Sequence, residues 1–199
     1  TKSGLQSENP RIVAGVIRAL EEMPSADLEA LDILPHLDSA NPALRSTASD
    51  IALGHPSWDA AIANRFFEWE PPFTEEQRKT LTEIIPALTD TPPMQVFLTS
   101  ILKSGDKSSI QLALTALASA PQLSLDPDWE PLLAPLLSSN AALDLRDLTL
   151  EVLAKEPGKR FEAELAALAE NPELPRLTRL GAARAAAKQQ GALSGAAFE

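Results

Sequence analysis

Apolar residues recur along this chain at intervals of three and four positions, which is the spacing of one face of an α-helix. The first clear helical segment begins after Asn9, because an asparagine N-cap followed by proline is a common helix start. Its expected buried stripe consists of Ile12, Val13, Val16, Ile17 and Leu20. No segment alternates apolar and polar residues as a half-buried strand does. The pattern therefore predicts an all-α chain.

Further helices are predicted along the rest of the chain, separated by short joints rich in Pro, Gly and Asn. The second would be capped by Ser25 and would bury Leu28, Leu31, Leu34 and Leu37. The third would start at Asn41 and Pro42 and would bury Leu44, Ala48, Ile51 and Ala52. The remaining helical segments are 57–69, 74–89, 92–103, 107–119, 127–138, 141–155, 160–170 and 175–189. About eleven short helices favour stacked helix pairs, because a four-helix bundle has fewer and longer helices.

An internal repeat supports the stacked arrangement. Pro35, Pro86 and Pro135 each lie in a predicted helix that leads through a polar turn into a second helix. These prolines are 51 and 49 residues apart, which indicates three helices for each repeat step. One such unit cannot bury its apolar faces alone, so neighbouring units would share a continuous core. Since the composition shows no break, we interpret residues 1–199 as a single domain.

The turn over residues 37–45 resembles the signature of the HEAT repeat. In that family a proline in the first helix precedes an Asp/Asn-Pro turn and a hydrophobic-Arg pair that opens the second helix. The matching residues here are Pro35, Asn41, Pro42, Leu44 and Arg45. Arg146 and Arg179 stand at similar places later in the chain, whereas Gln95 stands where a basic residue is expected. The resemblance implies a HEAT-like α-solenoid, an armadillo-like α-α superhelix of about eleven short helices.

Four residues of this turn, Pro35, Asp38, Asn41 and Pro42, are candidates for a purely structural role. Arg45 follows them in the first turn of its helix. From there its guanidinium group can reach the carbonyls of the preceding turn or the carboxylate of Asp38. We therefore expect Arg45 to stabilise the fold, although it also belongs to the partner-binding candidates given below.

A narrower resemblance involves residues 55–58, 128–129, 132–137 and 175–183. These stretches look like the helical-repeat region of multidomain proteins of planctomycetes and verrucomicrobia. In those proteins a membrane-bound, sugar-dehydrogenase-like propeller precedes HEAT-like repeats and a cytochrome c-type haem domain. The resemblance implies an exported or periplasmic parent in which this region spaces redox domains. The start at Thr1 and the small residues of 191–199 fit a fragment of such a larger protein.

Charge and composition narrow the possible partners. A formal net charge of −11 argues against the basic surface that nucleic acids and anionic membranes require. The lack of cysteine excludes disulfides, Cys-based metal sites, thiol nucleophiles and covalent haem attachment. No apolar run approaches the roughly 18 residues of a transmembrane helix. We expect binding to neither duplex DNA nor haem, no membrane insertion, and partners that are proteins or flanking domains.

Catalytic chemistry finds little support in the sequence. The histidines His36 and His55 have no carboxylate at motif spacing, and pairs such as Glu75 and Glu76 suit the positive end of a helix better than glycoside hydrolysis. Nucleophile elbows, phosphate-binding loops and zinc motifs do not occur. We expect no catalytic, cofactor-binding or metal residues, and tryptophans 58, 69 and 129 that anchor packing. The alternative is an enzyme on the same scaffold, of a bilin lyase-like or glycosylase-like kind.

Function would then lie on the surface formed by the second helices, predicted at 10–23, 42–54, 92–103, 107–119, 141–155 and 175–189. Polar residues on these helices mix both signs of charge, which suits a complementary protein surface. The candidate partner-binding residues are Arg11, Arg18, Arg45, Asp50, Arg146, Glu151, Arg176, Arg179 and Arg184. The sequence thus predicts a non-catalytic helical-repeat scaffold for interactions between proteins or domains.

Overall fold

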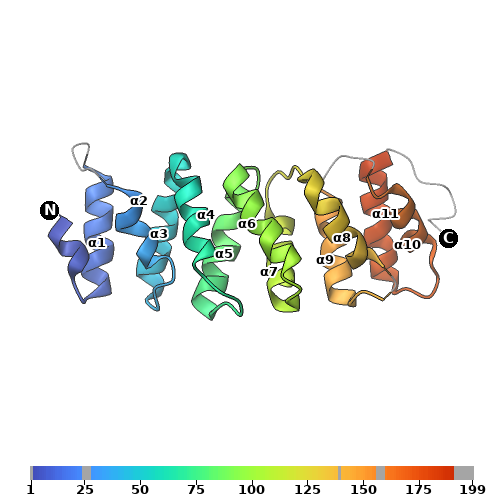
Figure 1. Ribbon diagram of the computed structural model, residues 1–199, viewed down its shortest axis with the longest axis horizontal. Helices are drawn as coiled ribbons and strands as arrows, with labels where there is room; N and C mark the ends of the chain where they lie inside the picture. The colour runs from blue at the N-terminus through green and yellow to red at the C-terminus, as the bar shows by residue number, and fades with distance from the viewer. Residues whose placement is uncertain (1, 24–27, 139, 156–159, 191–199) are drawn as a thin grey trace. The chain divides into compact units, whose positions relative to one another are not determined.

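The computed structural model describes residues 2–23, 28–138, 140–155 and 160–190, and in these ranges every regular element is helical (Figure 1). The α-helices are α1 (Pro10–Glu21), α2 (Ala30–Ile33), α3 (Pro42–Gly54), α4 (Asp59–Phe67), α5 (Glu75–Leu88), α6 (Pro92–Lys103), α7 (Lys107–Ser119), α8 (Glu130–Leu137), α9 (Leu143–Leu153), α10 (Glu162–Glu170) and α11 (Arg176–Gln190). Short 3₁₀ helices are η1 (Lys2–Gln6), η2 (Leu34–His36), η3 (Pro56–Trp58) and η4 (Pro127–Trp129). The predicted all-α class is confirmed.

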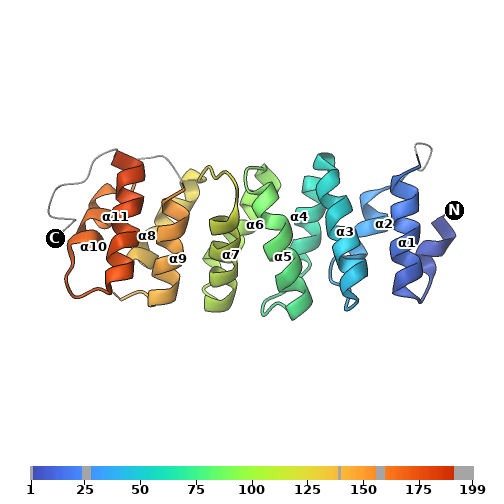
Figure 2. The same ribbon diagram turned by 180° about the vertical axis from the view of Figure 1, so that it is seen from behind.

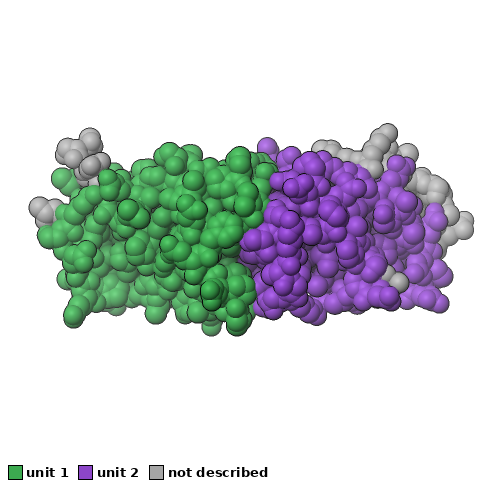
Figure 3. Space-filling model, viewed as in Figure 1, with its two compact units in different colours: residues 1–97 green, residues 98–199 purple. Residues whose placement is uncertain are grey.

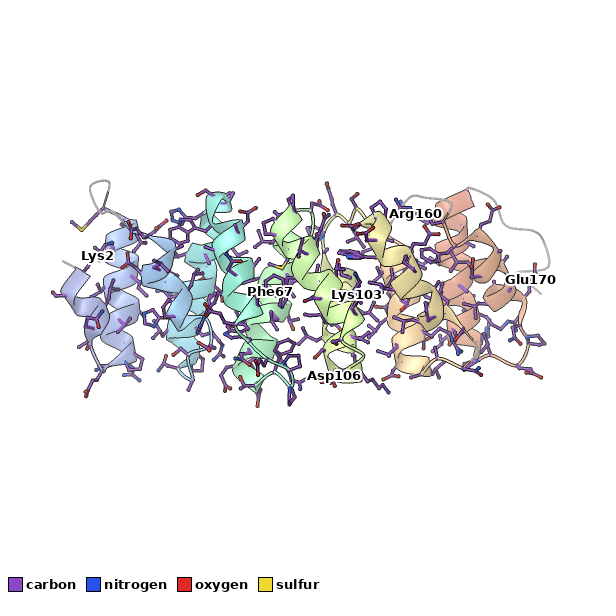
Figure 4. All side chains as sticks on the ribbon, viewed as in Figure 1. Lys2, Phe67, Lys103, Asp106, Arg160 and Glu170 are labelled. Carbon is purple, nitrogen blue, oxygen red and sulfur yellow. The ribbon has the colours of Figure 1, made fainter. Side chains whose placement is uncertain are left out.

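Several helices begin at a polar side chain that accepts hydrogen bonds from the first-turn backbone N–H groups. Asn9 and Asn41 cap α1 and α3 in this way, and each is followed by proline. Thr74 caps α5, and Asp106, which is labelled in Figure 4, caps α7. A cap of this type contributes about 1 kcal/mol, because it satisfies donors that have no partner within the helix. Local sequence therefore determines where these helices start.

The chain divides into two compact units, residues 1–97 and 98–199 (Figure 3). In the first unit α3 packs against both α1 and α5, and α4 lies on the opposite side of this layer (Figures 1 and 2). In the second unit α9 packs against both α7 and α11, and α8 and α10 contact each other on the opposite side. Each unit is thus a stack of helix pairs, with odd-numbered helices in one layer. The interpretation of 1–199 as one domain stays a prediction.

The repeat is shorter than the proline spacing suggests. The odd-numbered helices begin at residues 10, 42, 75, 107, 143 and 176, so one step takes 32 to 36 residues and two helices. The predicted step of 49 to 51 residues with three helices is wrong. Pro86 lies inside α5, which packs on α3, whereas Pro135 lies inside α8 of the other layer. HEAT and armadillo units are longer, about 40–47 residues, so HEAT-like remains a resemblance of the turn.

Residues 92–103 also differ from their predicted place among the second helices. The ring of Phe97 in α6 lies 5.6 Å from that of Phe66 and 5.2 Å from that of Phe67, both in α4. Within the first unit α6 therefore packs on an even-numbered helix. The sequence pattern placed 92–103 among the second helices and left out 74–89. In the structure α5, not α6, packs beside α3 in the odd-numbered layer.

Two predicted apolar stripes are only partly correct. Ile12 is 50% exposed, because α1 turns Val13, Ala14, Ile17 and Leu20 inward instead. Leu31 is 79% exposed, because α2 is a single turn that begins after Glu29 and passes into η2 at Leu34. Pro35 in η2 has no backbone N–H to continue an α-helix. Ser25, the predicted cap, lies outside the described residues.

A shared arginine contact joins the start of four odd-numbered helices to the chain before them. Each arginine is the fourth residue of its helix, and the four are Arg45, Arg78, Arg146 and Arg179. Arg45 donates from Nη1 to the carbonyl oxygen of Ser39 at 2.7 Å, which confirms the predicted reach to the preceding turn. Asp38 accepts instead from Arg65 at 3.2 Å. Arg146, only 3% exposed, donates from Nη2 to the carbonyls of Ser138 at 2.7 Å and Ala141 at 3.1 Å.

Arg78 and Arg179 make the same kind of contact with a backbone carbonyl. Arg78 donates from Nε to the carbonyl of Phe73 at 3.1 Å, and Arg179 donates from Nε to the carbonyl of Ala169 at 3.2 Å. Arg78 therefore stands where the sequence comparison placed Gln95. Carbonyls at and beyond a helix end lack intrahelical partners, and a cation is favoured at that end of the helix dipole. The arginines thus stabilise the junction within a helix pair.

Replacing Arg146 by alanine should lower the free energy of unfolding by about 1.5–3 kcal/mol, because buried hydrogen bonds from a charged donor contribute that much. Arg45→Ala should act in the same direction and less strongly, since one carbonyl loses its donor instead of two. Urea unfolding followed by circular dichroism measures both. The matched control is Arg11→Ala, at an exposed position of α1. An equal loss in the control would show that the carbonyl contacts are not the cause.

Candidate functional site

The ninth residue of every odd-numbered helix is polar and remains unburied. The six are Arg18, Asp50, Glu83, Thr115, Glu151 and Arg184. Four of them were among the predicted partner-binding residues, and Glu83 and Thr115 were not. They recur with the step of 32 to 36 residues, so the correct period would have revealed them. Within each unit these side chains lie on the side of the odd-numbered layer that the even-numbered helices do not cover, which we call the open side.

Two successive helices of this layer enclose a groove in the second unit. The groove lies between α9 and α11 and has a volume of about 330 Å³. Its lining residues are Asp147, Leu150, Glu151, Ala154, Leu177, Gly181 and Arg184. Leu150 is buried, whereas Leu177 on the other wall is 80% exposed. The groove therefore combines an apolar floor with an open rim.

The charges of this groove are distributed unevenly between its walls. Asp147 and Glu151 lie one turn apart on α9, and Arg184 lies on α11. The carboxylate of Asp147 accepts a hydrogen bond from the hydroxyl of Thr178 at 2.8 Å, which holds it at the wall. In the described part of the chain, the side chains of Glu151 and Arg184 make no hydrogen bond or ion pair. Their charges are available to a ligand.

The first unit has a smaller groove in the corresponding layer, between α1 and α3. Its volume is about 230 Å³, and Arg18 and Asp50 from the predicted set line it. Thr47 and Ile51 are the buried lining residues. Glu21 also lines it, and its carboxylate lies 3.0 Å from Nε2 of His55. Sequence reasoning found no carboxylate partner for His55, because Glu21 is 34 positions away.

The other predicted partner-binding residues lie elsewhere. Arg45 and Arg146 are buried on backbone carbonyls, and Arg179 also donates to a carbonyl, so their guanidinium groups are used inside the fold. None of these three residues lines either groove. Arg11 and Arg176 are exposed but line neither groove. The structure thus brings Glu151 and Arg184 together, and separately Arg18 and Asp50.

The turn candidates occupy the joint between η2 and α3. Pro35 is in η2, Pro42 is the first residue of α3, and the side-chain oxygen of Asn41 accepts from the backbone of Ala43 and Leu44, both at 3.1 Å. Asp38 is ion-paired with Arg65. These contacts are internal to this unit, in line with a structural role.

Tryptophans mainly pack inside the units. Trp129 is fully buried, and its indole N–H donates to the hydroxyl of Thr99 at 2.8 Å. Trp69 is buried against Phe66, with ring centroids 4.9 Å apart. Trp58 is half-buried and stacks on His55 at 4.0 Å. The three therefore form no common stacking surface.

The part of the chain that the structure describes holds neither a metal-binding cluster nor a membrane-spanning helix. No three His, Asp or Glu side chains come together there in a way that would hold a metal ion. Likewise, none of the described helices combines the length and apolar character needed to cross a bilayer.

The surroundings of His36 change the titration of its imidazole. Burial lowers the pKa of its imidazole below the usual value, and the nearby carboxylate of Asp38 opposes this. The charged form is thus less favourable in the folded state than in the unfolded state. Stability is unaffected above the unfolded pKa and falls as the pH drops through the unfolded value towards the folded one.

The free energy of unfolding of the wild type should therefore decrease between pH 7.5 and pH 5 more steeply than that of His36→Gln. Glutamine cannot take up the proton, so only the wild type acquires a half-buried charge. Urea unfolding at four pH values across this range measures the difference. Parallel pH profiles for the two proteins would contradict a role for His36 protonation.

Gly181 in the α9–α11 groove should tolerate alanine and gain stability from it. A Cβ atom there would lie 3.5 Å from Cδ1 of Leu150, an ordinary van der Waals contact. Glycine within a helix costs about 0.5–1 kcal/mol relative to alanine, so Gly181→Ala should raise the free energy of unfolding by that amount. Gly15→Ala in α1 is the control, since nothing lies near its Cβ position. A lower free energy of unfolding in Gly181→Ala together with a higher one in Gly15→Ala would mean that the groove floor is already filled.

Comparison with known proteins leaves the family of this chain open. No protein-family model matches the sequence, and no curated protein matches it. Among solved structures, it is similar to the crystal structure of an engineered protein, with 17% sequence identity and a TM-score of 0.49. The match covers 94% of this chain and 94% of that one. At this level the likeness carries no weight for function, and the stacking of helix pairs rests on the packing described above.

Proposed function

We propose that this chain is a non-catalytic interaction module that binds a protein or a flanking domain through the open side of its odd-numbered helices. One observation carries the proposal. Within each unit, charged residues from two successive repeats line a groove on the open side, Arg18 and Asp50 in the first unit and Glu151 and Arg184 in the second. Among the described residues, none of these four side chains makes an internal hydrogen bond or ion pair. Other charged groups of this acidic chain do pair internally, for example Lys107 with Asp144 at 2.9 Å.

Mixed charges of this kind favour register and specificity. Opposite charges across an interface guide encounter, and like charges placed opposite each other exclude wrong partners. A surface with both signs on an otherwise acidic chain suits a protein partner with a matching pattern. The extended surfaces of stacked helical repeats are commonly used in this way.

The resemblance drawn from the sequence favours particular partners. They are flanking redox domains of one exported parent protein, a dehydrogenase-like propeller and a cytochrome c-type haem domain. In that case the module spaces or orients the two domains. The alternative, an enzyme on the same scaffold, would require reactive groups that converge on one site. The two carboxylates of the α9–α11 groove lie with a guanidinium group and an exposed leucine, and this combination suits binding of a protein side chain.

Site-specific photo-crosslinking in the cell that makes the protein tests the proposal. Benzoylphenylalanine replaces Asp50 or Arg184 on the open side, and Ala60 or Glu164 on the even-numbered helices serves as the matched control within each unit. All four positions are exposed. We expect at least fivefold more protein adduct from the two open-side positions. Adducts from the control positions alone would place the interface on the even-numbered helices and contradict the proposed surface. Adducts from none of the four positions would contradict an interaction module.

A further inference from the structure

The α9–α11 groove is the surface feature that combines unburied apolar area with unpaired charge. Leu177 is 80% exposed and Leu180 is 51% exposed, and they lie three residues apart on α11. Covering such side chains is favourable by about 25 cal/mol for each Å² of apolar surface removed from water. The volume of about 330 Å³ is near the lower end for small-molecule pockets, which is roughly 300–1,000 Å³. With one wall this exposed, the groove suits a side chain delivered by a larger partner.

Packing of α11 explains why its leucines point outward. The buried residues of this helix are Thr178 and four alanines, Ala182, Ala183, Ala185 and Ala186. Their small side chains allow α11 to pack closely against α10 and α9. The larger apolar side chains at 177 and 180 are consequently left on the outside. Gly181, between the two walls, adds no side chain to the groove, so the space above Leu150 stays open.

The charges decide which partner fits. Two carboxylates, Asp147 and Glu151, stand on the α9 wall against one guanidinium group, Arg184, on the α11 wall. A basic side chain would meet the two carboxylates of α9, whereas an acidic one would be repelled there. A second copy of this chain is disfavoured, because a molecule with net charge −11 brings mostly like charge to an acidic wall. Arg184 repels a basic group at its own end and so limits where the partner can place its positive charge.

We infer that the groove binds a segment of a partner protein that places a leucine-sized apolar side chain between α9 and α11 and a Lys or Arg against Asp147 and Glu151. The inference rests on the proposed function and specifies the chemistry of its partner. The apolar side chain fills the space that Gly181 leaves open. The basic side chain pairs with Glu151, which has no partner of its own in the described structure, and lies close to Asp147, which Thr178 holds in place.

A phage-displayed library of random 12-residue peptides, panned against the full chain, tests this chemistry. The selected peptides should carry Lys or Arg within four residues of Leu, Ile or Met. One of them is then synthesised, and its dissociation constant is measured by isothermal titration calorimetry. Selection of acidic peptides, or of none, overturns the inference.

Substitutions in the groove provide the second part of the test. Glu151→Lys should weaken binding of the synthetic peptide at least tenfold, and Gly181→Leu should do so by filling the groove. Arg184→Glu should strengthen binding several-fold, because it removes a repulsive charge. Glu164→Lys in α10 and Lys103→Glu in α6, both at exposed positions, are the matched controls and should leave binding unchanged. Lys103 is labelled in Figure 4.

Each outcome has one interpretation. Unchanged binding in Glu151→Lys and Gly181→Leu overturns the inference, as does a loss of binding in Arg184→Glu, which would indicate an acidic partner group. Circular dichroism confirms that each variant is folded. Sedimentation that reveals a dimer abolished by Gly181→Leu would assign the groove to a second copy instead. If photo-crosslinks form at Asp50 and Arg184 while no peptide is selected, the interaction module stands and only this partner chemistry fails.

Discussion

The guanidinium groups of Arg45 and Arg146 are buried where one helix of a pair ends and the next begins. A helix end leaves carbonyl oxygens without partners, and burying them unpaired would cost free energy. The fourth residue of the second helix lies one turn from its start, close enough to donate to those carbonyls. Where arginine is absent, in α1 and α7, Val13 and Ile110 at the same position are buried and apolar. The arginine junction thus stabilises the pairing at four of the six odd-numbered helices, and buried apolar packing takes its place at the other two.

Once the pairs are formed, the odd-numbered helices of each unit present the same positions inward and outward. The seventh residue is buried in α3, α5, α7, α9 and α11, as Ala48, Leu81, Ala113, Thr149 and Ala182. The ninth residue is rotated by about 200° from the seventh, since each helical step turns by about 100°, and it reaches the open side. Within each unit, residues more than 30 positions apart in the sequence therefore share a surface. In each unit a groove lies between two successive helices of this layer.

In the second unit, the packing of α11 leaves apolar side chains beside charged ones on this surface. In α11 the buried positions hold small side chains, Thr178 and four alanines, so close approach of the helices leaves no room inside for leucine. Of the leucines that remain outside, Leu177 lines the same groove as Asp147 and Glu151 of α9. The two walls together carry two carboxylates and one guanidinium group, that of Arg184. Apolar area supplies favourable burial, and the charges restrict which side chains can accompany it.

Local sequence determined the helices of this protein. The segments 92–103 and 107–119 match α6 and α7 to the residue, and Asn9 and Asn41 cap helices as expected, because period and capping act within a few residues. The candidate site was only partly predictable. Arg18, Asp50, Glu151 and Arg184 were found by their place on helices, whereas Leu177 and Gly181 were missed because an apolar pattern does not show which apolar residues stay outside.

Only the tertiary structure decided which helices stack together and which arginines turn inward. Pro86 and Pro135 interrupt backbone hydrogen bonding in the same local way, yet they lie in helices of different layers. The layer of a helix depends on contacts such as those of Phe97 with Phe66 and Phe67, which join residues about 30 positions apart. The same holds for Arg146 and Arg184, which are both arginines on second helices. One meets unpaired carbonyls across a buried junction and the other faces an open groove, and this difference arises from the packing of neighbouring helices.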